Sequence, residues 1–167
     1  GAVNRRLVDT VIDLRDAGPG ERALDLFCGV GNFTLPMARR FDHVLGVEGD
    51  AGLVQRAADN ARHNGIANAA FHTWDLSRDS RAQSWWPGRI DKVLLDPPRT
   101  GAREALEAIA ALNPRRVVYV SCNPATLARD AAELTGRGYR LTRAGAVDMF
   151  PHTAHVEGVA VFDAGRR

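Results

Sequence analysis

Short apolar runs rich in β-branched residues alternate with helical patterns along most of this chain, and this alternation constrains its fold more than any other feature. The strand-like runs fall at about residues 22–27, 43–48, 69–74, 90–95 and 115–121. Helical patterns lie between most of them, at about residues 33–40, 50–63 and 102–112. Because parallel strands need crossover connections of this kind, the sequence predicts an α/β fold, with a parallel sheet covered by helices on both faces.

The two ends of the chain extend this core in different ways. Residues 5–16 repeat apolar side chains at helical spacing, which predicts an N-terminal helix. After a helix near residues 124–136, segments 139–147 and 155–163 follow with no room for a helix between them, so we expect them to pair antiparallel. The sheet is then seven-stranded and mostly parallel, with an antiparallel strand pair at its C-terminal end. Residues 80–88 follow neither period, and we expect a surface turn there.

The length of 167 residues suits one domain, so we assign residues 1–167 to a single folded unit. Two cysteines provide neither a disulfide framework nor a four-ligand zinc set, which predicts a reducing, cytoplasmic setting and no metal site. No apolar run approaches the roughly 18 residues that span a bilayer, so we expect a soluble monomer with no membrane partner. The net charge is only +2 and Lys92 is the only lysine, a bias toward arginine that does not by itself indicate RNA.

The first expected strand leads through a turn with two glycines, D-L-F-C-G-V-G-N-F at residues 25–33, into a helix. Gly29 and Gly31 allow the backbone to approach a ligand closely. A dinucleotide-binding fold would carry a third glycine where this chain has Thr34, so an NAD site is disfavoured. A nucleoside without phosphate fits this turn best, and S-adenosylmethionine is such a ligand.

Acidic residues stand at the ends of three expected strands. Glu48 lies 17 residues after Gly31, where a carboxylate can accept hydrogen bonds from both hydroxyls of a ribose. Asp75 ends the third strand and can accept from an adenine amino group, and Asp96 ends the fourth. Each acid taken singly fits a helix cap or a solvated turn as well. Three of them at one edge of a parallel sheet predict a nucleoside site.

Asp96 opens the motif D-P-P-R at residues 96–99, whose prolines end the strand and stiffen the wall of the crevice. Methyltransferases that modify amino groups of bases also carry D-P-P here, but follow it with an aromatic residue. Arg99 follows in this chain, which indicates a site for an acidic or oxyanionic group. Cys28 lies inside the glycine turn, where we expect a structural role.

The motif S-C-N-P at residues 121–124 follows the apolar run of the fifth strand. In an open parallel sheet the ligand crevice lies outside the carboxyl ends of the strands, so Cys122 is a candidate nucleophile displayed at that crevice. A free cysteine is also among the residue types most often buried. On its own, this position fits a nucleophile and a structural thiol equally.

Taken together, these pieces resemble the RNA uracil-C5 methyltransferases, most closely the bacterial 23S rRNA 5-methyluridine enzymes. The resemblance covers nearly the whole chain. It is carried by D-L-F-C-G-V-G-N-F-T-L-P at residues 25–36, V-E-G at 47–49, D-P-P-R at 96–99, S-C-N-P at 121–124 and D-M-F-P-H-T-A-H-V-E at 148–157. The first and last motifs are closer to the rRNA branch than to the tRNA branch. The resemblance implies a class I S-adenosylmethionine-dependent methyltransferase with a Rossmann-like sheet.

The resemblance also implies roles for particular residues. It implies that S-adenosylmethionine lies against Phe27, Gly29, Gly31, Asn32, Glu48, Asp75 and Asp96. It implies that Cys122 is the nucleophile that adds to C6 of a uridine and that Glu157 is the base that takes the proton from C5. We expect Arg99, Arg129 or the start of the following helix to favour the Cys122 thiolate.

Further implications concern partners and alternatives. The family's RNA-binding β-barrel, its central domain and the iron–sulfur cysteine cluster of many rRNA members are expected to lie outside this chain, with rRNA as the substrate. A tRNA uracil-C5 methyltransferase and a cofactor-binding fragment that is inactive alone, or that only binds RNA or a partner, remain alternatives. Cytosine-C5 methylation is another, although it would place a Pro-Cys pair after the fourth strand, where this chain has residues 96–98 without cysteine.

Overall fold

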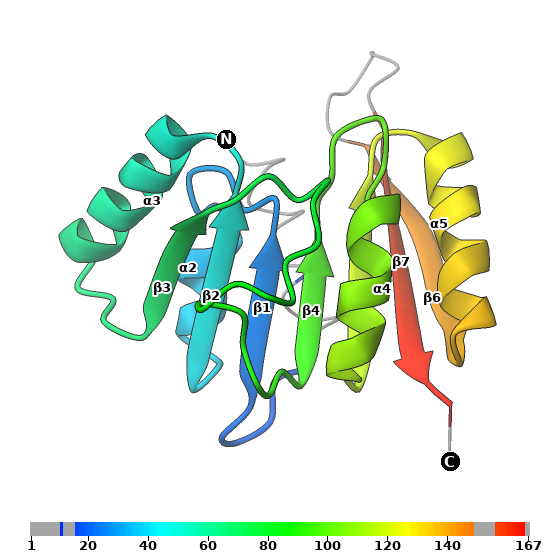
Figure 1. Cartoon of the computed structure of the whole chain (residues 1–167), viewed down its shortest axis with the longest axis horizontal. Coiled ribbons are helices and arrows are strands. Elements are labelled where there is room, and N and C mark those ends of the chain that lie inside the picture. The colour runs from blue at the N-terminus through cyan, green and yellow to red at the C-terminus, as the bar shows by residue number, and fades with distance from the viewer. Residues whose placement is uncertain (1–10, 12–15, 149–155, 166–167) are drawn as a thin grey trace.

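The computed structural model describes residue 11, residues 16–148 and residues 156–165. They form one seven-stranded sheet in the order β3-β2-β1-β4-β5-β7-β6 (Figure 1). The strands are β1 (Arg22–Leu26), β2 (His43–Glu48), β3 (Ala69–Thr73), β4 (Lys92–Leu95), β5 (Arg116–Ser121), β6 (Tyr139–Asp148) and β7 (Val156–Ala164). The first five run parallel, whereas β7 pairs antiparallel with both β5 and β6.

Helices cover both faces of this sheet. They are α2 (Thr34–Ala38), α3 (Ala51–His63), α4 (Arg103–Leu112) and α5 (Pro124–Gly136). Figure 1 shows α4 and α5 in front of the sheet and α2 behind it. The front core includes Leu106, Ile109 and Leu134, and the core on the other face includes Phe33 and Met37. Because strands between two helical layers are buried on both faces, β4 and β5 read as continuous apolar runs.

The order of strands reverses direction between β1 and β4, since the chain first builds outward to β3 and then returns to the other side of β1. In open α/β sheets the crevice at such a switch point lies outside the carboxyl ends of the strands and binds ligands. Those ends form the upper edge of the sheet in Figure 1. The fold therefore directs attention to the loops that follow β1, β2, β3, β4 and β5.

The sequence-based expectations for these elements are largely confirmed. All seven strands are present, with the parallel core and the antiparallel C-terminal pair as expected. The helix expected at residues 33–40 is shorter, because hydrogen bonds from Arg39 and Arg40 to the carbonyls of Pro36 and Met37 close the chain into a turn. The N-terminal helix expected at residues 5–16 lies outside the described residues except for Val11, which is helical and buried, and Asp16, which is exposed and lies outside any helix.

The connection between β3 and β4 agrees with the expectation only in part. Residues 81–88 form turns and bends with several exposed side chains, as expected. Ser80 is buried, however, and Trp85 and Trp86 pack against the core on the front face of the sheet. Trp85 stacks on His72 with ring centroids 5.5 Å apart and meets Trp74 edge-on at 6.1 Å. Aromatic rings therefore cover a part of the sheet that a helix would otherwise cover.

The opposite end of the sheet is fastened by buried charges. The ammonium group of Lys92 lies 3.0 Å from the Glu21 carboxylate and donates to the carbonyl of Asp16, and Arg115 also pairs with Glu21. Glu21 and Lys92 are both buried, so their pairing offsets the loss of their hydration. None of the described helices is long and apolar enough to cross a membrane.

Candidate active site

A cleft of about 500 Å³ opens at the carboxyl ends of β1, β2 and β3. Three of the residues predicted to bind cofactor line it together: Phe27, Glu48 and Asp75. The loop after β4 contributes the facing wall through Pro98, Thr100 and Gly101 (the other lining residues are Gly49, Leu76, Ser77 and Glu104). No lysine or arginine is among the described residues that line this cleft, so its charged side chains are all carboxylates.

The turn after β1 is shaped by left-handed backbone and by Glu48. Phe27, Gly29 and Gly31 have φ angles of +62°, +55° and +89°. Such a φ is uncommon for a phenylalanine, so the turn holds Phe27 in an unfavourable backbone region at the cleft wall. Glu48 accepts hydrogen bonds from the backbone N–H of Gly29 at 3.2 Å and of Asp50 at 2.8 Å. Each carboxylate oxygen keeps a second lone pair, with which Glu48 can accept from a ligand hydroxyl.

Asp75 is exposed at the end of β3 and forms a local turn. Its Oδ1 accepts from the hydroxyl of Ser77 at 2.6 Å and from the Ser77 N–H at 3.0 Å. These hydrogen bonds, the side-chain one first, lower the pKa of Asp75 below its ordinary value. Asp75 therefore presents an ionised carboxylate at the cleft.

Gly31 and Asn32 lie apart from the other predicted cofactor residues. Both line a second cavity, of about 430 Å³, between the glycine turn, α2 and α3. Asn60 of α3 donates to the carbonyl of Val30 at 3.3 Å and so fixes the turn to that helix. The structure thus places three of the predicted cofactor residues at the 500 Å³ cleft and two at this second cavity, whereas Gly29 and Asp96 line neither of them.

Cys122 is exposed between the end of β5 and the start of α5. Its two neighbours lock this turn. The Ser121 hydroxyl donates to the carbonyl of Asn123 at 2.9 Å and accepts from the Asn123 N–H at 3.0 Å. The Asn123 side chain caps α5 by accepting from the Ala125 N–H at 3.1 Å. The thiol is thus held at the N-terminus of a helix, which favours negative charge.

The pairing of β5 with β7 brings Glu157 to the same edge. Ser121 is the register partner of Gly158, so Cys122 follows the last paired residue of β5 beside the part of β7 that carries Glu157. Glu157 is partly buried and lies close enough to Asp96 to raise the pKa of that residue. The strand pairing therefore brings the predicted nucleophile and the predicted base to the same edge of the sheet from distant parts of the sequence.

The carboxyl groups of Asp25 and Glu157 both lie close to that of Asp96. Burial, and after it the negative charges of Asp25 and Glu157, raises the pKa of Asp96 to about 7. Asp25 is fully buried in β1, and the hydroxyl of Thr34 donates to it at 2.6 Å. Sequence reasoning missed Asp25 as part of the site. An acidic residue within an otherwise apolar buried strand was the signal that could have identified it.

The raised pKa of Asp96 predicts a pH-dependent stability. Its folded-state pKa of about 7 exceeds the ordinary value of 3.8, so the folded protein retains a proton that the unfolded chain loses. The contribution of Asp96 to the free energy of unfolding is fully present below about pH 4, where the group is protonated in both states, and is lost as the pH rises through 7. Urea titrations at pH 5 and pH 8 measure the free energy of unfolding of Asp96→Asn and of the unsubstituted chain. The difference, variant minus unsubstituted chain, should be more favourable to the variant at pH 8 than at pH 5 by roughly 2–3 kcal/mol. A difference that does not change with pH would contradict the assignment.

Cys28 occupies the glycine turn as a packing residue, as expected. It is 6% exposed, and a Cβ atom built on Gly46 would lie only 3.1 Å from its sulfur. Burial, and after it the carboxylates of Asp25 and Glu48, raises the pKa of the Cys28 thiol far above its ordinary range. A buried thiol that stays protonated is a poor nucleophile, so Cys122 is the reactive candidate.

The arginines expected to favour the Cys122 thiolate lie in contacts with other groups. The guanidinium of Arg129 pairs with Asp130 at 3.1 Å and donates to the carbonyl of Thr100 at 2.9 Å. Arg99 is exposed, and its carbonyl accepts from Asn123 and Thr126. Both arginines therefore belong to the contact between the D-P-P-R loop and α5.

Comparison with known proteins agrees with this geometry. A family model described as tRNA (uracil-5-)-methyltransferase matches residues 1–85 and 86–164. The 23S rRNA (uracil(1939)-C(5))-methyltransferase RlmD of Alkalilimnicola ehrlichii is 60% identical over 161 residues, which are 96% of this chain and 36% of that protein. The enzyme of the same name from Xylella fastidiosa strain 9a5c is 56% identical over 164 residues, 98% of this chain and 37% of its own length. The chain thus spans little more than a third of these relatives.

Solved structures are similar to this chain at the level of the family and of the fold. The tRNA (uracil-54, C5)-methyltransferase of Pyrococcus abyssi, in complex with S-adenosyl-L-homocysteine, superposes with a TM-score of 0.80 at 34% identity, covering 95% of this chain and 38% of that one. The magnesium protoporphyrin IX methyltransferase of Synechocystis PCC 6803 shares the fold, with a TM-score of 0.75 at 20% identity over 98% of this chain and 81% of that one. The predicted class of fold and the resemblance are confirmed, and the chain belongs to the tRNA (uracil-5-)-methyltransferase family.

Proposed function

We propose that residues 1–167 form a catalytic domain that transfers a methyl group from S-adenosylmethionine to C5 of a uridine in RNA. The observation that carries this proposal is the pairing of β5 with β7, which brings Cys122 to the same edge of the sheet as Glu157, whose charge reaches Asp96. The nucleophile and the base that the reaction needs therefore share one edge with the cleft lined by Phe27, Glu48 and Asp75.

The charge of the cleft suits S-adenosylmethionine. The charged lining residues of the cleft are Glu48, Asp75 and Glu104, which would repel a phosphate but suit a ligand with a sulfonium and an amino group. Glu48 would hold the ribose hydroxyls, Asp75 the adenine amino group, and Phe27 the adenine ring. Gly29, Gly31 and Asn32 remain predicted contacts of the glycine turn.

The chemistry assigns separate steps to Cys122 and Glu157. The Cys122 sulfur forms a bond to C6, and the electrons of the C5–C6 double bond move toward C4 and its oxygen, which makes C5 nucleophilic. The bound cofactor supplies an electrophilic methyl group, which C5 takes up. The Glu157 carboxylate then removes the proton from C5, and the electrons of that C–H bond restore the double bond and expel the Cys122 thiolate.

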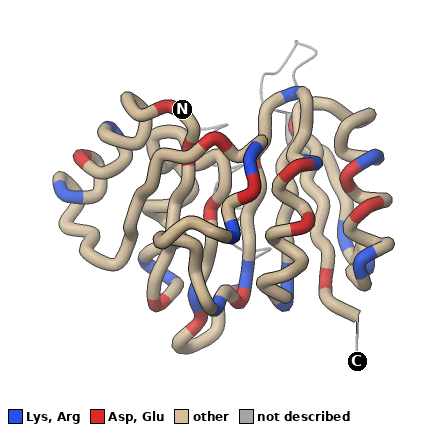
Figure 2. The backbone as a smooth tube through the Cα atoms, viewed as in Figure 1, with Lys and Arg blue, Asp and Glu red and all other residues tan. Residues whose placement is uncertain are grey.

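We propose rRNA rather than tRNA as the substrate. The relatives at 60% and 56% identity are named as 23S rRNA enzymes, whereas the tRNA enzyme of P. abyssi is 34% identical. Figure 2 shows basic and acidic residues interspersed along the visible backbone, in keeping with a net charge of +2. Such a surface supplies little non-specific attraction for phosphates, so we expect much of the affinity for RNA to come from parts of the relatives beyond this region.

Transfer of labelled methyl groups tests the function. Unmodified 23S rRNA transcripts and tRNA transcripts are incubated with the chain and labelled S-adenosylmethionine, then digested to nucleosides. We expect label in 5-methyluridine from 23S rRNA. Label in 5-methylcytosine would overturn the assignment of the base, and label only in tRNA would overturn the rRNA branch. Cofactor binding without transfer would favour a domain that is inactive alone.

Removing the carboxylate of Glu48 should weaken cofactor binding. Glu48→Ala is expected to reduce the affinity for S-adenosylmethionine by about 1.5–3 kcal/mol, the usual contribution of hydrogen bonds to a charged group. Calorimetric titration measures this change. Asp59→Ala is the matched control, because Asp59 is an exposed carboxylate paired with Arg62 on the outside of α3. Normal binding by Glu48→Ala would refute the ribose assignment.

A further inference from the structure

The D-P-P-R loop, defined here as residues 96–101, is fastened to α5 through its own carbonyl groups. The side chains of Asn123 and Thr126 both donate to the carbonyl of Arg99 at 3.0 Å. The guanidinium of Arg129 donates to the next carbonyl, that of Thr100, at 2.9 Å. These three donors come from successive turns at the start of the helix that follows Cys122.

A buried carboxylate anchors this contact from below. Asp130 is fully buried on α5, and it accepts from the hydroxyl of Tyr119 at 2.6 Å and from the N–H of Ala102 at 2.8 Å. Its other oxygen accepts from Arg129 at 3.1 Å. The N-cap of α4 is Ala102, which has no side-chain acceptor of its own. Asp130 therefore binds the start of α4 from a neighbouring helix, where a negative charge is favourable.

The last residue of the loop leaves no space between these groups. Gly101 has a φ of +85°, and a Cβ atom there would lie 2.5 Å from the Arg129 guanidinium and 2.7 Å from the Asp130 carboxylate. Only glycine allows the backbone to approach this ion pair so closely. The loop, Arg129 and Asp130 are thus packed as one unit.

We propose that Arg129 and Asp130 are positioning residues for the methyl transfer. They hold the D-P-P-R loop, which carries Asp96 and lines the cofactor cleft through Thr100 and Gly101, at a set distance from Cys122. The loop and the nucleophile then share one rigid support, because both are attached to the first turns of α5. This inference rests on the proposed function and adds two residues that touch neither uridine nor cofactor.

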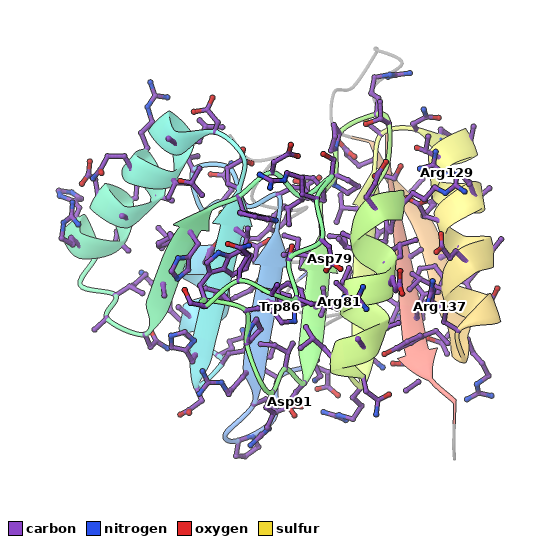
Figure 3. All side chains as sticks on the ribbon, viewed as in Figure 1. Asp79, Arg81, Trp86, Asp91, Arg129 and Arg137 are labelled. Carbon is purple, nitrogen blue, oxygen red and sulfur yellow. The ribbon has the colours of Figure 1, made fainter. Side chains whose placement is uncertain are left out.

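A control on the same helix separates this role from a contribution to folding alone. The Arg129 side chain is 42% exposed, whereas its partner Asp130 is fully buried and keeps the hydrogen bonds from Tyr119 and Ala102 when the Arg129 charge is removed. Figure 3 shows Arg129 near the upper end of α5, beside the loop, and Arg137 near the lower end of the same helix. Arg137 also makes an ion pair, with Glu133 at 3.3 Å, and its side chain is 36% exposed. It therefore provides a matched control for the loss of one positive charge.

Covalent capture of RNA that contains 5-fluorouridine tests the proposal, because fluorine blocks the last proton removal and leaves the adduct intact. The maximal rate of capture at saturating RNA should fall by about tenfold to a hundredfold in Arg129→Met, as expected for a misplaced reacting group. It should be unchanged in Arg137→Met. With S-adenosylmethionine also at saturation, the RNA concentration at half-maximal rate should be unaltered, and Arg129→Lys should restore part of the maximal rate.

A double substitution shows whether Asp130 acts through the same contact. Asp130→Asn keeps an acceptor for Tyr119 and Ala102 but loses the charge that pairs with Arg129. Combined with Arg129→Met, it should slow capture no further than the slower single variant. Equal losses in Arg129→Met and Arg137→Met, or losses confined to RNA affinity, would overturn the positioning role. If the unsubstituted chain forms no adduct, the proposed function itself fails, and the positioning role fails with it.

Discussion

Replacing Cys122 by alanine is expected to abolish methyl transfer and to abolish the covalent adduct with RNA that contains 5-fluorouridine. Both results follow from one cause, because C5 of uracil becomes nucleophilic only after sulfur has added to C6. The sulfur is lost without damage to the fold, since Cys122 is exposed and the turn is held by Ser121 and Asn123. Denaturing gels with labelled RNA measure the adduct, and labelled S-adenosylmethionine measures the transfer.

Cys28→Ala is the matched control for this experiment. Cys28 is the only other cysteine of the chain. It lies within the glycine turn, its side chain is buried, and burial raises the pKa of its thiol. We expect this variant to form the adduct at close to the normal yield, with some loss of stability from the removed buried sulfur. Adduct that persists in Cys122→Ala and disappears in Cys28→Ala would exchange the two assignments.

Much of the fold could be predicted because the buried strands carry a strong local signal. β4 and β5 consist mainly of apolar residues buried on both faces, so their pattern needs no knowledge of neighbours. The connection between residues 139–147 and 155–163 is too short for a helix, which likewise predicted an antiparallel pair. The packing of the β3–β4 connection could not be predicted. The Trp85 ring contacts His72 and Trp74, and the Trp86 ring contacts Trp85, and no local period in the sequence encodes these contacts.

The site could be predicted only where its residues directly follow strands. Glu48, Asp75 and Cys122 were placed at one edge by the general rule for parallel sheets, and the structure brings Glu48 and Asp75 into one cleft. The proximity of Asp25 to Asp96 depends instead on the pairing of β1 with β4, in which Leu26 lies beside Leu95. No local pattern encodes such a register.

The anchoring of the D-P-P-R loop was missed for a similar reason. Asp130 occupies the buried face of α5, and its partner Tyr119 comes from β5, while Ala102 begins α4. Three elements must be assembled before this carboxylate gains Tyr119 and Ala102 as hydrogen-bond donors. An acidic residue on the apolar face of a helix was the available signal, because burying an unpaired charge is costly and implies partners.

Replacing Glu157 by glutamine separates proton removal from the earlier steps. Addition of Cys122 to C6 and methylation of C5 both precede the removal of the C5 proton, so Glu157→Gln should still form an adduct with ordinary uridine. Turnover should fall by about a hundredfold to ten-thousandfold, the usual contribution of a general base. The neutral amide also removes one of the negative charges that raise the pKa of Asp96. Loss of this charge should therefore not reduce the free energy of unfolding of Glu157→Gln at pH 8, compared with the unsubstituted chain.

Accumulation of a methylated adduct is the decisive sign in Glu157→Gln. On denaturing gels it would appear as a protein–RNA band that carries the label from S-adenosylmethionine and decays slowly when unlabelled cofactor is added. Asp163→Asn offers a control on the same strand, since Asp163 lies at the far end of β7 and pairs with Arg116 at 2.6 Å. Normal turnover in Glu157→Gln would remove Glu157 from the mechanism. An unmethylated adduct would instead place Glu157 before methyl transfer, because proton removal from C5 follows only after the methyl group has arrived.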